Sequence, residues 1–334
     1  MKRMLLAGVA AIALTGAATA QEIEELNFGI ISTESSAALE ESFGPFLVEL
    51  EEFLGIPVNP FFAQDYAGVI EGMRFDEVDV AWFGNASAMQ AVDRAEGEIF
   101  AQTVKDTGEM GYYSLLIANV DNDDINGIED VLNCDAGFTF GNGDPNSTSG
   151  FLVPSYYVFA LNGVTPDDCY SRVLNSNHET NALAVANGQV DFATNNTESL
   201  YARLVQERPE DAANIKEIWR SPLIPGDPMV WRGDLPQSAK NQIYTFFMTF
   251  GRMGTPEEVA AERAILANLS DGWGPFVPSS NAQLYPIRQL ALFRDRLTTE
   301  ADDTLSDDEK AERIAEIDAQ LDELNRLAET VPNM

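Results

Sequence analysis

Basic residues and histidine are scarce in this chain. It has 20 Lys and Arg against 54 Asp and Glu, one histidine and a formal net charge of −34. Such a charge repels nucleic acid and anionic membrane surfaces, which excludes nucleic acid as a partner. It also repels an anionic ligand at long range, so any bound anion needs preorganised short-range donors. Acidic surfaces keep exported proteins soluble in salty surroundings, where ions screen the repulsion, and the composition favours a saline habitat.

Long apolar runs are lacking as well. The N-terminal run, residues 5–14, is too short to span a bilayer, and no other run approaches the necessary length of about 18 residues. This run follows Lys2 and Arg3 and precedes Ala18-Thr19-Ala20, which is typical of a secretory signal peptide. We therefore expect residues 1–20 to be removed by cleavage after Ala20 and the mature chain to be exported.

Cysteine is the third scarce residue. Cys134 and Cys169 are the only two, and together with one histidine they form no ligand cluster for a metal. We expect no cofactor. An exported protein can form disulfides, so we hypothesise a Cys134–Cys169 bridge, with two buried thiols as the alternative.

The N-terminal part alternates between strand and helix patterns. Leu26, Phe28 and Ile30 occupy every second position, as in a strand. Apolar residues then recur at helical spacing over residues 43–54, with Gly55 at the helix end, and residues 58–62 form a second apolar segment. This alternation predicts an α/β lobe with a mostly parallel sheet flanked by helices.

Two segments of the chain resemble one another. Residues 72–81 lead through Val-Asp-Val-Ala to Asn85, and residues 188–193 lead through Val-Asp-Phe-Ala to Asn195. Their aspartates, Asp79 and Asp191, lie 112 positions apart, about the length of one lobe. Chance could produce so short a repeat. It also fits two similar lobes whose strand-end loops face a shared cleft.

The lobe limits follow from the apolar runs between the two segments. We expect a first lobe over residues 21–118 that is completed by 221–300, and a second lobe over 119–220. The extended apolar runs 114–119 and 218–225 are the predicted connectors.

A C-terminal amphipathic helix is predicted over residues 301–334. Ser306 and Glu309 form a capping box. An apolar stripe follows at spacings of three and four, formed by Ile314, Ile317, Leu321, Leu324 and Ala328. The stripe is about two heptads long, so either packing on its own lobe or a homodimer contact fits it.

The segment 141–150, GNGDPNSTSG, carries the strongest functional signal. It follows a strand-like run and precedes a helical one, so Ser147, Thr148 and Ser149 are expected at a helix N-terminus. Unpaired N–H groups and the helix dipole favour an anion there, and the hydroxyls add donors. No lysine follows the glycines, which excludes a Walker A loop. The alternative is an ordinary N-cap.

Other polar residues could complete such a site. His178 stands where another loop enters a helix and is either an anion ligand or a structural residue. Tyr66 and Tyr112 could donate hydroxyls or simply pack. Glu198 and Asp227, on turn-rich loops, fit an anion site only if the ligand also carries a positive charge. No G-x-S-x-G elbow and no orienting carboxylate accompany the serines, which disfavours a hydrolase.

Together these segments resemble the periplasmic phosphonate-binding proteins of ABC importers, especially those that bind 2-aminoethylphosphonate. The resemblance covers nearly the whole mature chain. It rests on FGIISTES (28–35), FFAQDYAGVIEGMRF (61–75), FGNGDPNSTSGFLVP (140–154), NHETNALAVANGQVD (177–191), ATNNTE (193–198), SPLIPGDPMVWR (221–232) and PIRQLALF (286–293). The chain departs from the family pattern at Phe83, where the family has tyrosine, and at Tyr113, where it has tryptophan.

The resemblance implies a type II two-lobe periplasmic-binding fold, a periplasmic location and a permease partner. It also implies that Ser147, Thr148, Ser149 and His178 grip the phosphonate oxygens, with Tyr66 and Tyr112 nearby. Glu198 and Asp227 would bind the ligand amine.

Three other functions remain open from the sequence. The nearest is a receptor for phosphite, phosphate or a simple alkylphosphonate. A secreted phosphonate hydrolase is the second, and a receptor that serves a membrane signalling partner is the third.

Overall fold

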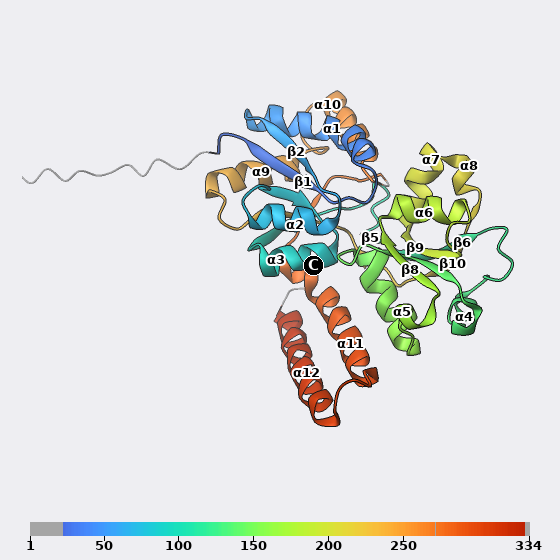
Figure 1. The fold of residues 1–334 in the computed structure, drawn as a ribbon. Helices are drawn as coiled ribbons and strands as arrows, with labels where there is room; N and C mark the ends of the chain where they lie inside the picture. The colour runs from blue at the N-terminus through green and yellow to red at the C-terminus, as the bar shows by residue number, and fades with distance from the viewer. Residues whose placement is uncertain (1–22, 271, 331–334) are drawn as a thin grey trace, which may run out of the picture.

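Two α/β lobes and a helical hairpin make up the molecule. The computed structural model describes residues 23–270 and 272–330, so the predicted signal peptide and its cleavage site lie outside the described residues. Figure 1 shows the lobes side by side, with the hairpin extending away from the first lobe. The predicted two-lobe α/β fold with a C-terminal helix is confirmed.

The first lobe is built on a six-stranded sheet with the order β13-β4-β12-β3-β1-β2. Its strands are β1 (Leu26–Ile30), β2 (Val58–Phe62), β3 (Val80–Trp82), β4 (Gly97–Gln102), β12 (Pro228–Arg232) and β13 (Val277–Pro278). Its helices are α1 (Ser36–Leu54), α2 (Tyr66–Arg74), α3 (Asn85–Arg94), α9 (Gln237–Thr249) and α10 (Pro256–Ala267). The predicted strand 26–30, the helix end at Gly55 and the strand 58–62 are confirmed.

The second lobe contains a five-stranded sheet with the order β10-β6-β9-β7-β8. Its strands are β6 (Ser114–Asn119), β7 (Thr139–Gly143), β8 (Arg172–Ser176), β9 (Phe192–Asn196) and β10 (Ile215–Arg220). Its α-helices are α4 (Ile128–Val131), α5 (Pro166–Cys169), α6 (His178–Ala186), α7 (Val205–Glu207) and α8 (Pro209–Ala212). Its 3₁₀ and π segments are η1 (Cys134–Ala136), η2 (Thr148–Leu152), η3 (Ser155–Phe159), η4 (Ala160–Asn162) and η5 (Glu198–Leu204).

Both sheets are mixed rather than mostly parallel. In the first lobe β2, β1 and β3 run parallel, but β12 is antiparallel to β3 and β4, and β13 is antiparallel to β4. In the second lobe β8, β7 and β9 run parallel, whereas β6 is antiparallel to β9 and β10. The reversed strands lie next to the points where the chain enters or returns to a lobe, which local alternation of strand and helix does not reveal.

The two predicted connectors are instead mostly strands. Residues 114–119 form β6, which lies inside the second sheet between β10 and β9, and residues 218–220 belong to β10. An uninterrupted apolar run is typical of a strand buried on both faces, and Leu115, Leu116 and Ile117 are fully buried. Between the sheets, β5 (Gly111–Tyr112) pairs with β11 (Ile224–Pro225) in a short two-stranded ladder.

The sequence repeat corresponds to a structural repeat. Strands β1, β2 and β3 and strands β7, β8 and β9 have the same parallel order, and a helical segment follows each strand. Asp79 accepts a hydrogen bond from the Asn27 N–H at 2.8 Å, and Asp191 accepts one from the Thr139 N–H at 2.7 Å. Asn27 and Thr139 are also 112 positions apart. Because carboxyl ends of parallel strands share one edge of a sheet, both halves present helix N-termini to the space between the lobes.

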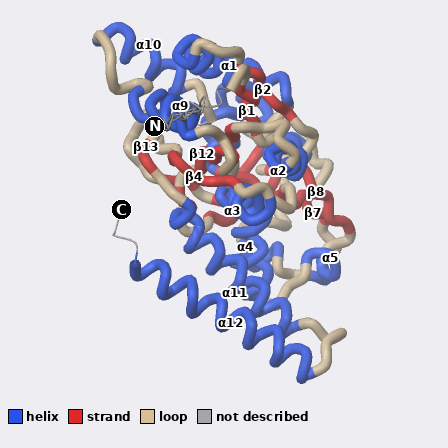
Figure 2. Tube along the Cα trace, turned by 90° about the vertical axis from the view of Figure 1, so that its left-hand side faces the viewer, coloured by secondary structure: helices blue, strands red, loops and turns tan. Residues whose placement is uncertain are grey.

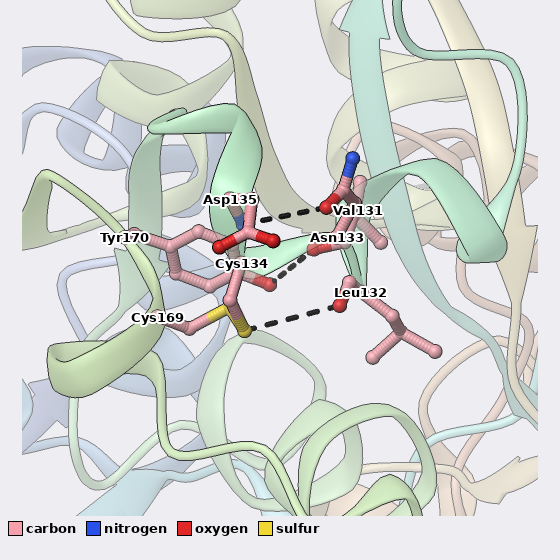
Figure 3. The surroundings of a disulfide bond; sticks show 7 residues. All are labelled: Val131, Leu132, Asn133, Cys134, Asp135, Cys169 and Tyr170. Carbon is pink, nitrogen blue, oxygen red and sulfur yellow. Dashed lines mark hydrogen bonds between the residues drawn. A yellow bond between two sulfur atoms is a disulfide. The ribbon is translucent and has the colours of Figure 1, made fainter.

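A disulfide fastens one part of the second lobe. Cys134 and Cys169 are bonded, with their Cα atoms 4.5 Å apart, which joins η1 to the end of α5 (Figure 3). The Tyr170 hydroxyl donates to the Val131 carbonyl at 2.8 Å beside it. None of these residues lines the cavity described below, so the bridge supports the lobe rather than the site.

The C-terminal helices form an antiparallel hairpin. The short η6 (Asn281–Leu284) leads into α11 (Tyr285–Ala301), and α12 (Asp307–Thr330) turns back beside α11 (Figure 2). The capping box is confirmed, because the Ser306 N–H donates to Glu309 at 2.9 Å and the Glu309 N–H donates to the Ser306 hydroxyl at 3.4 Å. Leu321 and Leu324 are buried. The stripe therefore packs within its own chain, and the homodimer stays a prediction.

No helix in the part of the chain that the structure describes is long and apolar enough to cross a membrane.

Candidate functional site

A cavity lies between the two lobes, and about 340 Å³ of space there, counted together with the open solvent at its mouth, is not filled by protein atoms. All eight residues predicted from the sequence as ligand contacts line it: Tyr66, Tyr112, Ser147, Thr148, Ser149, His178, Glu198 and Asp227. They come from both lobes and from the β5–β11 ladder. Residues that are distant in sequence thus converge on one small space.

The Ser-Thr-Ser run begins helix η2. Ser147 is the N-cap, and its hydroxyl accepts a hydrogen bond from the Gly150 N–H at 2.9 Å, so the ordinary capping interpretation also holds for this residue. The first turn is π-helical, with the Leu152 N–H bonded to the Ser147 carbonyl at 3.0 Å. All three side chains are buried at the cavity wall. The first N–H groups of a helix lack partners within it, which favours an anion at this end.

His178 lies next to the Ser-Thr-Ser run. It is the first residue of α6, whose N-cap Asn177 accepts a hydrogen bond from the Thr180 N–H at 2.9 Å. Its Nε2 atom is 3.5 Å from the Ser149 hydroxyl, and the Asn196 side-chain amide donates to the same hydroxyl at 3.2 Å. Burial lowers the pKa of His178 to about 4, so the imidazole is neutral at neutral pH. An anion bound against it would raise that pKa.

The Ser149–His178 contact does not form a catalytic triad. The other ring nitrogen, Nδ1, is buried with no hydrogen-bond partner among residues 23–270 and 272–330. A nucleophilic serine needs a histidine oriented through that nitrogen by a carboxylate. Within the same ranges, no three His, Cys, Asp or Glu side chains are grouped to hold a metal ion.

The first lobe contributes Tyr66 and the N-terminus of α3. The Tyr66 side chain is hydrogen-bonded to Ser147, and its backbone N–H donates to Asp144 of the second lobe at 3.1 Å. Burial, aided by the charge of Asp144, raises the pKa of Tyr66 well above its usual value, so the phenol stays protonated and can donate. The Ala86 N–H donates to the Thr148 hydroxyl at 2.8 Å. The structure therefore has the lobes in contact around the cavity.

Two carboxylates form another part of the wall. Asp227 lies between β11 and β12, and its N–H donates to the Thr103 hydroxyl at 2.8 Å. The Tyr112 side chain is hydrogen-bonded to Asp227, and burial together with the charges of Asp227 and Glu198 raises the pKa of Tyr112 well above its usual value. Glu198, the first residue of η5, accepts a hydrogen bond from Ser270 at 3.2 Å. Glu198 is 8% exposed and Asp227 6%.

The charged residues that line the cavity are all acidic. The described residues that line the cavity include Glu34, Glu198 and Asp227 but no Lys or Arg. An anion in this space can be bound by hydroxyls, the imidazole and helix N-termini. The buried acids favour a cationic group as well, since a positive charge beside a buried carboxylate offsets the cost of its burial.

Sequence reasoning missed several lining residues. These are Ile31, Thr33, Glu34, Trp82, Gly84, Asn196, Ser199 and Ser270. Thr33 and Glu34 lie three and four residues after the end of β1, and Asn196 ends β9, so their place near strand carboxyl ends was a usable signal. Ser270 lies in a loop after α10 and carries no such signal.

The two departures from the family pattern lie outside the lining residues. Phe83 is fully buried in the core of the first lobe. Tyr113 packs against the Arg220 guanidinium, 5.3 Å from the ring centre. Neither change alters a residue of the cavity wall.

Comparison with known proteins agrees with the resemblance seen in the sequence. Residues 28–284 match the family described as periplasmic substrate-binding proteins of phosphonate ABC transporters. The chain is 55% identical over 315 residues to the phosphonates-binding periplasmic protein of Escherichia coli K12, which covers 94% of this chain and 90% of that protein.

Solved structures show the same fold. A binding-protein component of an ABC phosphonate transporter from Pseudomonas aeruginosa is 52% identical, with a TM-score of 0.87 over 92% of this chain and 99% of the other. A Prochlorococcus marinus protein solved in complex with methylphosphonate is 21% identical, with a TM-score of 0.68 over 80% and 97% of the two chains, a likeness of fold alone. The fold is the type II periplasmic-binding fold. The chain therefore belongs to the periplasmic substrate-binding proteins of phosphonate ABC transporters, a family of solute-binding proteins and not of enzymes.

Proposed function

We propose that this protein captures 2-aminoethylphosphonate in the interlobe cavity and delivers it to a membrane permease. The observation that carries this proposal is the combination of two kinds of groups in one cavity. Hydroxyls, an imidazole and helix N-termini suit an oxyanion, whereas Glu198 and Asp227 suit an ammonium group. A ligand with both ends satisfies both kinds of groups at once.

In this proposal the phosphonate is bound mainly from the second lobe. Ser147, Thr148 and Ser149 donate hydroxyl or backbone hydrogens to its oxygens, and His178 contributes a ring nitrogen. Tyr66 donates from the first lobe. Because no basic side chain of the described residues lines this part of the wall, selectivity for the tetrahedral anion comes from the fixed directions of neutral donors.

The amine end of the ligand is bound by the two buried acids. Glu198 belongs to the second lobe and Asp227 to the returning chain of the first, so an ammonium group between them contacts both lobes. Such a ligand stabilises the closed arrangement only by its greater affinity for that state. The permease would then recognise the closed protein. We also propose export with cleavage after Ala20, which the mass of the mature protein tests.

The test compares two ligands on variants that remove the acids' charge. Glu198→Gln and Asp227→Asn should each weaken 2-aminoethylphosphonate by about 30-fold or more, because losing one partner of a buried charged pair costs about 2–5 kcal/mol. Methylphosphonate, which lacks the amine, should bind within about threefold of wild type. Glu109→Gln is a matched control, since Glu109 is partly exposed, pairs with Lys105 and does not line the cavity.

Equal losses for the two ligands would contradict the amine-binding role. If methylphosphonate or phosphate binds wild type as tightly as the aminophosphonate does, the protein is instead a receptor for simpler oxyanions.

A further inference from the structure

An ion pair joins the two lobes beside the cavity. The Arg203 Nη1 atom on η5 of the second lobe is 3.0 Å from the Glu34 Oε2 atom, in the segment that follows β1 of the first lobe. The Thr33 hydroxyl also donates to Glu34. Both charged side chains are buried, Arg203 at 8% and Glu34 at 6% exposure. The role proposed above for the cavity does not use this pair.

The ion pair separates the cavity from an outer groove. Glu34 lines the cavity, whereas Arg203 lines a larger groove between α1, the end of α10 and η5. Ser270 lines both spaces. Its backbone has a φ of 45°, which is unusual for a residue other than glycine. The wall between the cavity and this groove therefore consists of contacts between the lobes, which break when the lobes separate.

Arg203 also offsets a repulsion between acids of opposite lobes. Glu179 of the second lobe accepts a hydrogen bond from the Ser35 N–H at 2.8 Å, which brings its charge close to Glu34. Burial raises the pKa of Glu34, Arg203 works against that shift, and Glu179 and Glu207 add to it. Without the guanidinium, closing the lobes would force these carboxylates together.

The π-helical form of η5 places two interlobe contacts on one face. Glu198 and Arg203 are five positions apart, which corresponds to one hydrogen-bonded turn of a π-helix. Both are buried, and each contacts the first lobe: Glu198 through Ser270 and Arg203 through Glu34. Glu198 and Arg203 thus belong to one segment and move together with it.

We propose that the Glu34–Arg203 pair is a latch that forms only when the lobes close, shuts the cavity toward the outer groove and sets the lifetime of the bound state. In the open state water solvates both charges separately. In the closed state each depends on the other, because an unpaired buried charge is strongly unfavourable. The latch acts on any ligand that closes the lobes, so it does not depend on which phosphonate binds.

The test measures association and dissociation rates by stopped flow with 2-aminoethylphosphonate and with methylphosphonate. Arg203→Met keeps the length of the side chain but removes its charge. It should raise the dissociation rate at least tenfold for either ligand and change the association rate less than threefold. Arg208→Met is the matched control, because Arg208 pairs with Asp211 within the second lobe and is half exposed. It should leave both rates unchanged.

A double variant tests whether the two residues act as a pair. Glu34→Gln with Arg203→Met should dissociate more slowly than Arg203→Met alone, since the acid repulsion is also removed. A dissociation rate of Arg203→Met within twofold of wild type would overturn the proposal, and so would strictly additive effects. If Arg203→Met does not fold, as thermal unfolding would show, Glu34→Gln alone must still speed dissociation for the proposal to stand.

Spin labels report the lobes directly. Glu52→Cys on the first lobe and Glu210→Cys on the second give one exposed label each, and the native cysteines are protected in their disulfide. In the Arg203→Met background the closed population at half-saturating ligand should fall, and an unchanged population would contradict the latch. If neither phosphonate binds wild type, the proposed function fails, while the closed population of the ligand-free protein still tests the latch.

Discussion

The two halves of the molecule have equivalent helix N-termini that contact different surroundings. Ser35 caps α1 and Ser147 caps η2, and the two serines are 112 positions apart, the same separation as in Asp79 and Asp191. Each hydroxyl accepts a hydrogen bond from the N–H three residues later, at 3.4 Å in the first half and 2.9 Å in the second. The scaffold is therefore repeated down to its capping interaction.

What lies against each N-terminus differs. In the first half the Ser35 N–H donates to Glu179 of the opposite lobe, and Ser36 and Ala37 are exposed. In the second half Thr148 and Ser149 occupy the corresponding positions and are buried in the cavity wall. The molecule places its own carboxylate against one helix N-terminus, whereas the equivalent N-terminus faces the cavity. An acidic group is thus the kind of partner that this scaffold accepts.

The next helix of each half begins with a residue that lines the cavity in both cases. Tyr66 is the first residue of α2 and His178 the first residue of α6, again 112 positions apart. Both side chains are buried in the cavity wall. The phenol is a donor whose pKa is raised by burial, whereas the imidazole is neutral because burial lowers its pKa. Equivalent positions therefore place different polar groups, a phenol and an imidazole, at the cavity wall.

The largest expected effect concerns the protonation of His178. Its pKa is about 4 in the folded protein and 6.5 in the unfolded chain. Below pH 6.5 the unfolded state binds a proton that the folded state does not. The free energy of unfolding therefore decreases as the pH is lowered from 6.5 to about 4. The wild-type protein should lose about 3 kcal/mol more free energy of unfolding than His178→Gln between pH 7 and pH 4. Urea unfolding at both pH values measures this, and equal losses would show that burial does not lower the pKa.

The second prediction exchanges the side chains that distinguish the two N-termini. Ser149→Ala should weaken every phosphonate by about 10- to 100-fold, because a hydrogen bond to a charged group contributes about 1.5–3 kcal/mol. The reciprocal change Ala37→Ser adds a hydroxyl at the equivalent exposed position of the first half. It should leave affinity unchanged. Kd values are measured by calorimetry. If Ser149→Ala and Ala37→Ser changed Kd equally, the two helix N-termini would not differ in their contribution to ligand binding.

The smallest expected effect tests the repeat itself. Asp79→Asn and Asp191→Asn each keep an acceptor for the strand N–H but remove its charge, so each should destabilise the protein by about 1 kcal/mol. Neither residue lines the cavity, and ligand selectivity should not change. Chemical unfolding and Kd measurements check both points. If changing Asp191 weakened ligand binding and changing Asp79 did not, Asp191 would belong to the binding site and not only to the scaffold.

Much of the fold was predictable because local patterns determine it. The alternation of Leu26, Phe28 and Ile30 predicted β1, and the glycine at 55 predicted the end of α1. The start of α1 at Ser36 lies before the helical spacing that was recognised from residue 43. The direction of β6 was not predictable, because the apolar residues of a buried strand are the same whether its neighbouring strands run parallel or antiparallel. The connector 114–119 was wrong for a related reason: an apolar run that joins lobes and one buried inside a sheet look alike.

The candidate site was predictable where its chemistry is concentrated. The Ser-Thr-Ser run and His178 stand out locally, and all eight predicted residues line one cavity. Glu34 and Ser270 were missed because their role depends on the opposite lobe, through Arg203 and Glu198. A contact made only when two lobes meet has no signature in either segment alone.

The most direct measurement is calorimetric titration of ligand-stripped protein with 2-aminoethylphosphonate, methylphosphonate and phosphate in parallel. We predict that the aminophosphonate binds most tightly, because it alone satisfies both the hydroxyl-lined helix N-terminus and the two buried carboxylates. Equal or tighter binding of methylphosphonate or phosphate would contradict the role of Glu198 and Asp227. No binding of any of the three would contradict the anion site at Ser147, Thr148 and Ser149.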